Sequence, residues 1–413
     1  MAEDAATGPG VADLLREIAT VGTDPTRGGY SRPVYSDAEL TLREWVIDHA
    51  GRRGMDVETD RNGIIWAWWN PRGGSPADAV VTGSHLDSVP GGGAFDGPLG
   101  VASALAAVDR LQAAGFRPTR PLGLAVFPEE EGSRFGIDCL GSRLLTGDLP
   151  PERAAALTDR DGVTFAEAAA RHGLDPHHLG PDRRVLDRIG VFVELHVEQG
   201  RGLIDLGRPV AIGTSILGHG RWRLTVSGQG NHAGTTLMTD RRDPMVAAAG
   251  MVTAVRDIAA AVPDTRATVG RLQPVPGGTN VIASAVHVWL DVRHPSDAVT
   301  ADVVRTIHDR ARHIAAAEGC AVELVGESLS RTVRFDAGLR DRLSGVLPEA
   351  PLLATGAGHD AGVLSTHVPT GMLFVRNPTG VSHSPSEHVE DADADAGADA
   401  LAAALRDLLS DPA

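Results

Sequence analysis

Residues 83–100 contain the first side chains of this sequence that could bind a metal ion. They place His85, Asp87 and Asp96 in a glycine-rich loop that follows the apolar run of residues 79–81. A histidine and carboxylates at the end of a buried strand suit a hydrolytic metal site, and the glycines permit close approach of the backbone. The segment therefore predicts metal-dependent hydrolysis.

A second acidic element is the triplet of residues 129–131, three glutamates that follow the apolar run of residues 122–127. Potential metal ligands in this sequence either follow predicted strands or lie in loops, and they are His85, Asp96, Glu131, His196 and His383. Histidine and carboxylate ligands without cysteine favour zinc, manganese, cobalt or nickel over a structural zinc finger. The alternative for each histidine is an ordinary polar loop residue, and for the triplet a solvated loop.

The bulk composition excludes several classes of function. A length of 413 residues predicts two or three domains, and a net charge of −16 argues against a nucleic-acid partner. No apolar run approaches the ~20 residues of a membrane span. The N-terminus lacks the basic and apolar segments of a secretion signal, and there are only two cysteines. We therefore expect a cytoplasmic protein with no membrane partner.

Strands and helices alternate over the first half of the chain. A capping box at residues 36–39 begins a helix that ends near Gly51, and a helix of small residues covers residues 100–114. Apolar runs predict strands at residues 56–69, 79–83, 122–127 and 191–195, and shorter helical pieces are expected at residues 151–158 and 163–171. This order predicts an α/β domain with a mixed, largely parallel sheet.

The pattern changes near Gly213, where a second unit begins. Its expected elements are a strand around residues 222–226, a helix at 243–262, strands at 267–273 and 285–293, a helix at 298–318 and a strand at 321–325. The order β-α-β-β-α-β is that of a ferredoxin-like α+β unit. We therefore predict a discontinuous catalytic domain, residues 1–212 and 328–413, with an inserted domain at residues 213–327. A C-terminal helix is expected after a solvated Asp-Ala tract at residues 391–396.

Nine motifs appear in a fixed order between residues 28 and 390. They are Gly-Ser-His85-Leu-Asp87-Ser-Val-Pro, Phe-Asp96-Gly, Glu130-Glu131-Gly-Ser-Arg-Phe, Glu-Leu-His196-Val-Glu-Gln199-Gly, Asn231-His232-Ala-Gly-Thr-Thr, Asn280-Val-Ile, Asp291-Val-Arg293-His, Gly-Ala-Gly-His359-Asp-Ala and Ser-His383-Ser-Pro-Ser-Glu. With these motifs the chain resembles the dinuclear metallo-amidohydrolases of the aminoacylase/carboxypeptidase clan. More narrowly it resembles the hydantoinase/carbamoylase branch, which holds N-carbamoyl-L-amino acid amidohydrolases, allantoate amidohydrolases and β-ureidopropionases.

The resemblance implies two divalent metal ions in each subunit. Asp96 would bridge them, with His85 and His196 completing one site and Glu131 and His383 the other. Asp87 would fix the imidazole of His85. Glu130 would be the general base that takes a proton from a water activated by the two ions.

The same resemblance implies that His232, Asn280 and Arg293, all in the inserted domain, reach an active site, often that of the neighbouring subunit. His232 would contact the oxyanion, and Arg293, aided by Asn280, would hold a substrate carboxylate through its bidentate guanidinium. His359 would line the pocket or support the site, with a glycine-rich structural turn as the alternative, and Gln199 would bind the substrate. From the residues alone, Arg293 could equally form a surface ion pair and Asn280 a turn. The chain departs from the family pattern at Leu237, where members usually carry proline. It also departs at His219, a predicted substrate-binding residue at a position where many members carry a glutamine or a short apolar residue that faces the substrate.

The implied reaction is hydrolysis of a linear, non-peptide C–N bond in a small ureido or amide substrate that carries a carboxylate. The carbamoyl group of an N-carbamoyl amino acid or of allantoate is the first expectation. An aminoacylase or dipeptidase activity, a specialised amide hydrolase of a biosynthetic pathway, and a non-catalytic metal-binding scaffold are the alternatives. The inserted domain would serve as lid and dimerisation domain of a homodimer.

Overall fold

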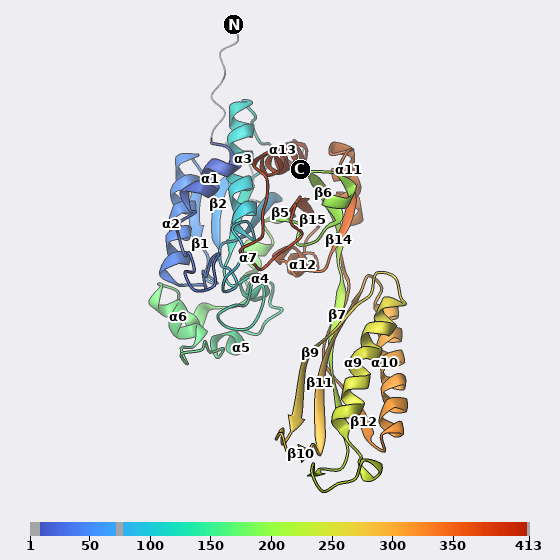
Figure 1. Ribbon diagram of the computed structural model, residues 1–413. Helices are drawn as coiled ribbons and strands as arrows, with labels where there is room; N and C mark the ends of the chain where they lie inside the picture. The colour runs from blue at the N-terminus through green and yellow to red at the C-terminus, as the bar shows by residue number, and fades with distance from the viewer. Residues whose placement is uncertain (1–8, 72–76, 411–413) are drawn as a thin grey trace. The chain divides into compact units, whose positions relative to one another are not determined.

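The computed structural model describes residues 9–71 and 77–410 (Figure 1). The expected lack of a secretion signal concerns residues 1–8, which lie outside the described residues. Among the residues that the structure describes, none of the helices combines the length and the apolar character that a membrane span requires.

The chain divides into two units. Unit 1 comprises residues 1–215 and 334–413, and unit 2 comprises residues 216–333. The predicted insert, residues 213–327, stops inside strand β12 (Ala321–Ser330). Unit 2 extends further because β12 stays paired with β7 (Gly218–Ser227) as far as Ser330.

Unit 1 alternates strands and helices around one sheet. Its helices are α1 (Val11–Glu17), α2 (Asp37–Arg52), α3 (Pro98–Ala113), α4 (Leu140–Thr146), α5 (Pro151–Ala155), α6 (Phe165–Arg171), α7 (Arg183–Leu186), α8 (Gly202–Leu206), α11 (Ala337–Val346), α12 (Asp360–Leu364) and α13 (Asp391–Leu409). Its strands are β1 (Asp56–Thr59), β2 (Ile65–Trp69), β3 (Ala79–His85), β4 (Leu122–Phe127), β5 (Ile189–Val197), β6 (Val210–Ile216), β13 (Val333–Arg334), β14 (Leu352–Thr355) and β15 (Thr370–Val375).

The sheet has the order β1-β2-β4-β3-β5-β15-β6-β13, with β14 paired to β6. Its central strands β4, β3, β5 and β15 are parallel, whereas β1, β2 and β6 join in antiparallel fashion. Helix α3 contacts α2 and α13, and α13 contacts α11, whereas α4 contacts α7 and α12 in a second group. This mixed α/β architecture confirms the predicted fold class.

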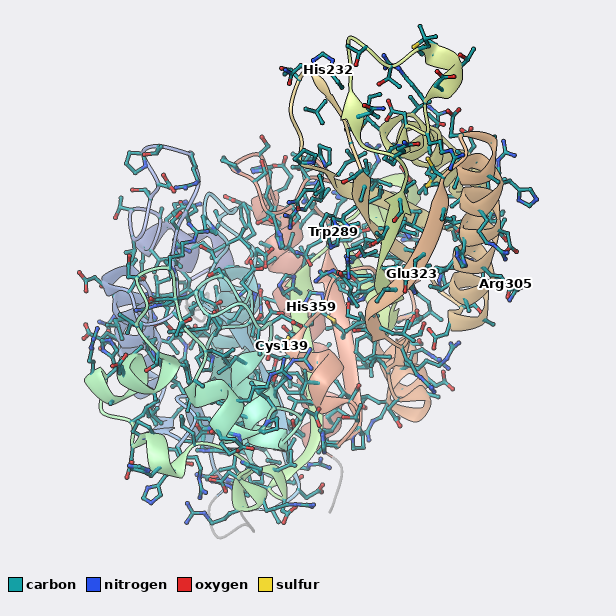
Figure 2. All side chains as sticks on the ribbon, turned by 90° about the horizontal axis from the view of Figure 1, so that it is seen from below. Cys139, His232, Trp289, Arg305, Glu323 and His359 are labelled. Carbon is teal, nitrogen blue, oxygen red and sulfur yellow. The ribbon has the colours of Figure 1, made fainter. Side chains whose placement is uncertain are left out.

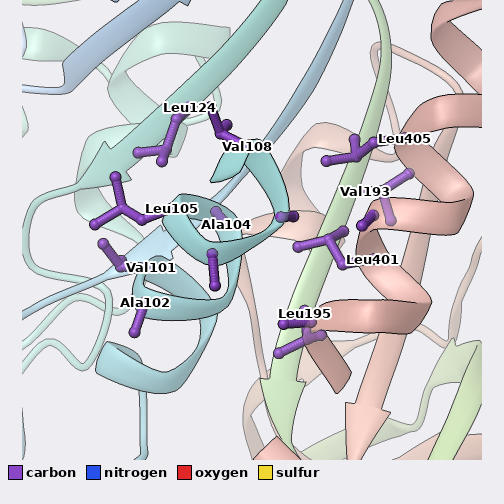
Figure 3. Close-up of a cluster of buried hydrophobic side chains, with 14 of the residues drawn as sticks. Val101, Ala102, Ala104, Leu105, Val108, Leu124, Val193, Leu195, Leu401 and Leu405 are labelled. Atoms are coloured by element: carbon purple, nitrogen blue, oxygen red, sulfur yellow. The ribbon is translucent and has the colours of Figure 1, made fainter. Parts of the chain in front are cut away.

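The main core lies between the central strands and the pair α3 and α13. Figure 3 shows Val101 and Leu105 of α3, Val193 of β5 and Leu401 and Leu405 of α13, and all of them are buried. Burying an aliphatic side chain of this size contributes roughly 1.5–3 kcal/mol. Helices cover both faces of the sheet, so the central strands consist of continuous apolar runs.

Two sequence predictions need correction in unit 1. The strand predicted over residues 56–69 is two strands, because Asp60 accepts the backbone N–H groups of Asn62 and Ile64 in a turn, with Gly63 at φ +84°. The solvated helix entry predicted at residues 391–396 is wrong for Asp393. That side chain is buried and forms a bidentate ion pair with Arg376 at 2.8 and 2.9 Å.

Unit 2 contains the predicted ferredoxin-like order. Its elements are β7, α9 (Pro244–Ala260), β9 (Arg266–Val275), β11 (Ala285–His294), α10 (Asp297–Ala317) and β12, with a separate pair formed by β8 (Asn231–His232) and β10 (Val281–Ile282). The antiparallel sheet has the order β12-β7-β11-β9. Alternate residues of β11, from Val286 to Val292, are buried against α9 and α10. The residues between them, from His287 to Arg293, lie on the opposite face of the sheet.

Candidate metal centre

The predicted ligands of unit 1 follow the carboxyl ends of its four parallel strands. His85 ends β3, His196 lies near the end of β5, Glu131 follows β4, and His383 follows β15. Because parallel strands end at the same edge of a sheet, these side chains are brought together there. These ligands span nearly 300 positions of sequence, and the order of the parallel strands in the sheet brings them together.

Asp96 reaches the same edge from the loop between β3 and α3. Gly97 follows it with φ +85°, and a Cβ at Gly97 would lie 2.6 Å from the His85 ring. Only glycine permits this close approach in this conformation. Pro98 then begins α3 at its first position, where a missing N–H has no cost.

The first ligand group consists of His85, His196 and Asp96, all of them buried. The two Nε2 atoms are 3.4 Å apart, and they lie 3.4 Å and 3.2 Å from Asp96 Oδ1. Although burial opposes its ionisation, the two histidines lower the pKa of Asp96 well below its usual range. The group thus presents a carboxylate to two imidazole nitrogens.

The chemistry of this group fits a cation. The Nδ1 atoms of His85 and His196 each face a backbone carbonyl at 3.0 Å, that of Asp87 and that of Val197. A carbonyl only accepts hydrogen bonds, so Nδ1 carries the hydrogen and Nε2 keeps a lone pair in the neutral ring. Two lone pairs and a carboxylate oxygen meeting at one point are the donor set of a divalent ion.

The second ligand group shares Asp96 and adds Glu131 and His383. His383 Nε2 lies 3.5 Å from Asp96 Oδ2 and 3.4 Å from Glu131 Oε2. Glu131 Oε1 is buried and has no hydrogen-bond partner among the described residues. An unpartnered buried carboxylate oxygen again fits a cation, and burial together with Asp96 raises the pKa of Glu131 to about 8.

Asp87 is placed beside His85, as expected, but its contacts differ from the prediction. His85 Nδ1 is closer to the Asp87 carbonyl, at 3.0 Å, than to its carboxylate, at 3.6 Å. The two carboxylate oxygens instead accept the backbone N–H groups of Glu130 and Glu131, each at 3.1 Å. Asp87 therefore holds the glutamate loop in register with the histidine.

Glu130 lies next to the ligand groups without belonging to either. Its Oε2 is 3.7 Å from His85 Nε2, and its Oε1 accepts from the Cys139 thiol at 3.6 Å. Burial raises the pKa of Glu130 well above its usual range, against the opposing effect of His85. Such a carboxylate is suited to accept and return a proton.

Gln199 and His359 lie close to the ligand groups. Gln199 Nε2 donates to Asp96 Oδ2 at 2.9 Å and lies 3.3 Å from His383 Nε2. The His359 ring, buried, is centred 4.5 Å from that of His196, and Figure 2 shows it in unit 1 together with Cys139. Burial and the charge of His196 lower the pKa of His359 well below its usual range.

Sequence reasoning missed two sets of polar residues at this site. Glu194, buried in β5, accepts from Ser84 Oγ at 3.1 Å and from the Ala361 N–H at 2.9 Å. Ser382 and Glu387 surround Asp96 from the loop after β15. A glutamate inside an apolar strand signals the first set, and the motif Ser-His-Ser-Pro-Ser-Glu contains the second.

The remaining predicted residues lie in unit 2. Arg293 faces His219 across the pairing of β11 and β7. The Arg293 guanidinium contacts Asp291, with Nε donating at 2.8 Å and Nη2 at 3.3 Å. Burial and Arg293 lower the pKa of His219. The predicted clamp residue is therefore held by a carboxylate of its own strand.

His232 and Asn280 meet at the other end of unit 2. Strands β8 and β10 pair His232 with Val281, and the Ala233 N–H donates to the Asn280 carbonyl at 3.0 Å. Figure 2 shows His232 at the tip of the unit, beyond Trp289 of β11. From Ala285 to Arg293, β11 covers roughly 26 Å at about 3.3 Å per residue. The structure therefore separates Arg293 from Asn280 within one chain.

Three features together indicate a metallohydrolase. They are a mixed sheet with helices on both faces, an inserted ferredoxin-like unit, and two ligand groups that share an aspartate. In agreement, residues 81–407 match the model of Peptidase family M20/M25/M40. The chain therefore belongs to this family. The members of the family are metal-dependent, which agrees with the candidate ligand groups.

Individual relatives indicate which branch of the family this chain resembles. The chain is 38% identical to the N-carbamoyl-L-amino acid amidohydrolase of Geobacillus stearothermophilus, over 94% of this chain and 95% of that protein. It is 33% identical to the ureidoglycolate hydrolase of Oryza sativa subsp. japonica, over 97% and 84%. A crystal structure of a hydantoinase/carbamoylase family amidase from Burkholderia multivorans aligns with a TM-score of 0.87 and 31% identity, over 98% of each chain. These findings confirm the resemblance stated from the motifs.

Proposed function

We propose that this protein hydrolyses the carbamoyl group of a small ureido compound that carries a carboxylate, such as an N-carbamoyl amino acid or allantoate. The observation that carries the proposal is the pair of ligand groups that share Asp96, with Glu130 beside them. The named activities of the relatives support hydrolysis of C–N bonds other than peptide bonds. We propose two divalent ions per subunit, of zinc, manganese, cobalt or nickel.

In the proposed reaction, Glu130 carries a proton from the attacking water to the leaving group. When bound, two divalent ions lower the pKa of a water and polarise the carbonyl of the substrate. Glu130 is tied to neither ligand group, so its carboxylate accepts the proton of the attacking water. It then returns that proton to the leaving nitrogen, so that ammonia, carbon dioxide and an amine are formed.

Arg293 is the residue that we propose to bind the carboxylate of the substrate. A guanidinium binds a carboxylate in bidentate fashion, and Asp291 already occupies Arg293 in this way. A substrate carboxylate would therefore replace Asp291 as the partner. His232, with its ring exposed at the tip of unit 2, would donate a hydrogen bond to the oxyanion.

A homodimer explains how His232 and Asn280 can act with Arg293. His232 and Asn280 lie beyond the Ala285 end of β11 and Arg293 lies near its other end. This strand covers roughly 26 Å from Ala285 to Arg293, so one chain cannot bring both groups to one small substrate. In a symmetric dimer, the tip of one subunit can complete the site of the other. Unit 2 would then serve as both lid and dimerisation domain.

The proposal is tested with a substrate panel. The purified protein, loaded separately with manganese, zinc, cobalt or nickel, is incubated with allantoate, N-carbamoyl-L-amino acids and N-carbamoyl-β-alanine. N-acyl amino acids and dipeptides form the second arm. We expect ammonia from at least one ureido compound. Amine release from acyl compounds alone would reassign the protein to the aminoacylase type, and no product from either arm in metal-loaded protein would contradict hydrolysis of this class.

A further inference from the structure

Glu387 is a buried carboxylate that neither ligand group includes. Its Oε1 accepts the backbone N–H groups of Phe95, at 3.1 Å, and of Asp96, at 3.0 Å. These bonds tie the loop between β3 and α3 to the loop after β15, nearly 300 positions later. The backbone of the shared ligand Asp96 is therefore fixed by a side chain from a distant segment.

The other oxygen of Glu387 acts on the side chain of Asp96 through Ser382. Ser382 Oγ lies 2.8 Å from Glu387 Oε2 and 3.3 Å from Asp96 Oδ2. A serine hydroxyl has one hydrogen, and the shorter contact is with Glu387. Glu387 therefore keeps this hydrogen away from Asp96 Oδ2, whose lone pairs face the second ligand group.

The close approach of Glu387 depends on a glycine. A Cβ at Gly93 would lie 2.2 Å from Glu387 Oε1, a distance that real Cβ atoms do not show. Gly93 has no side chain, so the carboxylate can reach the N–H groups of the loop. The chain thus offers a second position at which the same contact can be disrupted.

We infer that Glu387 is a positioning residue for Asp96, on which the binding of both metal ions depends. It fixes the Asp96 backbone, which serves both ligand groups, and it orients Ser382, which affects only the second. This inference rests on the two-ion site of the proposed function but not on the identity of the substrate.

Metal-free protein is titrated calorimetrically with Mn²⁺ or Zn²⁺ against a competing chelator. We expect Glu387→Ala to weaken both binding steps by about 10- to 100-fold, the usual effect of losing a residue that orients a ligand. Gly93→Ala should do the same. Glu387→Gln keeps an amide oxygen for the backbone N–H groups but cannot accept from Ser382, so only the second step should weaken. Glu390→Gln, an exposed carboxylate in the same segment, is the matched control.

The first site is measured alone in a His383→Ala background, because His383 belongs only to the second group. Glu387→Ala must weaken binding there as well. Unchanged affinity in that background would overturn the inference, because Glu387 would then act only on the loop of His383. Circular dichroism of the metal-free variants checks folding, and Gly93→Ala and Glu387→Gln carry the test if Glu387→Ala does not fold. If the titrations follow the expected pattern while no ureido compound reacts, the positioning role stands and the proposed function fails.

Discussion

At the scale of residues, Glu130 and Glu131 are neighbours in sequence with different surroundings. Glu131 faces His383 and Asp96, whereas Glu130 contacts His85 and Cys139. Three consecutive glutamates do not by themselves separate these roles, and in the sequence only the family motif that they share with Gly-Ser-Arg-Phe assigns them. The backbone conformation separates them, because Glu129 lies at φ +55° and accepts the N–H groups of Arg134 and Phe135.

Glu130→Gln should abolish turnover and leave metal binding intact. The amide has the shape of the carboxylate but cannot accept a proton, and loss of a general base lowers kcat by about 10²- to 10⁴-fold. Steady-state kinetics and elemental analysis of the same preparation measure both quantities. Glu152→Gln, at an exposed position of α5, is the control. A Glu130→Gln variant with full activity would show that another residue is the base.

Asp60 should make stability depend on pH away from the metal centre. Burial raises its pKa to about 6 from an ordinary value of 3.8, despite hydrogen bonds from Trp66, Ile64 and Asn62. A raised pKa contributes stability that is present below about pH 4 and is lost as the pH rises through 6. Its full size is on the order of 2–3 kcal/mol at 1.36 kcal/mol per unit of pKa.

The stability effect of Asp60 is measured against Asp60→Asn by urea unfolding between pH 4 and pH 7. The free energy of unfolding of the original protein should fall relative to that of the variant as the pH rises. The variant also alters the bond to Trp66, but that cost is the same at every pH. A difference that stays constant across this range would contradict the assignment.

At the scale of elements, the ends of parallel strands and the helix α3 hold the ligands in place. Gly100 of α3 lies so close to the sheet that a Cβ there would be 2.4 Å from the Leu195 carbonyl oxygen and 2.7 Å from Ser84 Cβ. Ser84 precedes His85, and Leu195 precedes His196. The contact surface of α3 therefore sets the position of both histidines of the first ligand group.

Gly100→Ala should destabilise unit 1 although alanine favours helix formation. The propensity gain is at most about 1 kcal/mol, whereas overpacking of this kind costs about 1–3 kcal/mol. Gly345→Ala in α11 is the matched control, since nothing lies within 4 Å of its Cβ position, and it should stabilise the protein. Urea unfolding of both variants measures the sign. Equal stabilisation by both would contradict the close packing of α3.

The elements were predictable where a single pattern dominated. Strands β3 and β4 are buried along their whole length and β5 at every residue except Gly190, and their apolar runs predict them. The boundary between β1 and β2 was not predictable from hydrophobicity, because a local hydrogen-bonded turn interrupts a run of similar composition. Strand β15 is equally buried but is absent from the predicted elements, although the position of His383 depends on it.

At the scale of the whole molecule, we propose that the site is completed by a second chain. His232 at the tip of unit 2 and Arg293 at the far end of β11 cannot serve one small substrate within a single copy. Neither residue type nor spacing reveals this separation. It follows from the register of the β11 and β7 pair together with the position of β8 and β10 at one end of the sheet.

Two inactive variants should therefore restore activity to each other. Glu130→Gln disables the catalytic unit, and His232→Ala disables the tip that serves the other subunit. A hybrid dimer of the two keeps one intact site, so mixing equal amounts should give about a quarter of the original specific activity after random exchange in a twofold dimer. Ammonia release after subunit exchange measures it.

The control for complementation pairs Glu130→Gln with His85→Ala. Both changes lie in unit 1, so every site of the hybrid stays defective and no activity should return. Light scattering establishes that the variants associate. Failure of the Glu130→Gln and His232→Ala mixture to gain activity, with hybrids present, would mean that each chain uses its own tip or that His232 is not required.

The sequence by itself determined which residues could bind metal, in which order they occur and which family carries that order. It could do so because His85, Asp87 and Asp96 are close in the chain, as are Glu130 and Glu131, and local spacing is visible in a sequence. Only the tertiary structure decided how Asp96 meets His196 and His383, because this depends on the order of parallel strands. It also decided that Asp87 holds the glutamate loop, that Glu387 holds Asp96, and that β11 separates Arg293 from Asn280. Each of these depends on contacts between segments far apart in the chain, which local spacing does not specify.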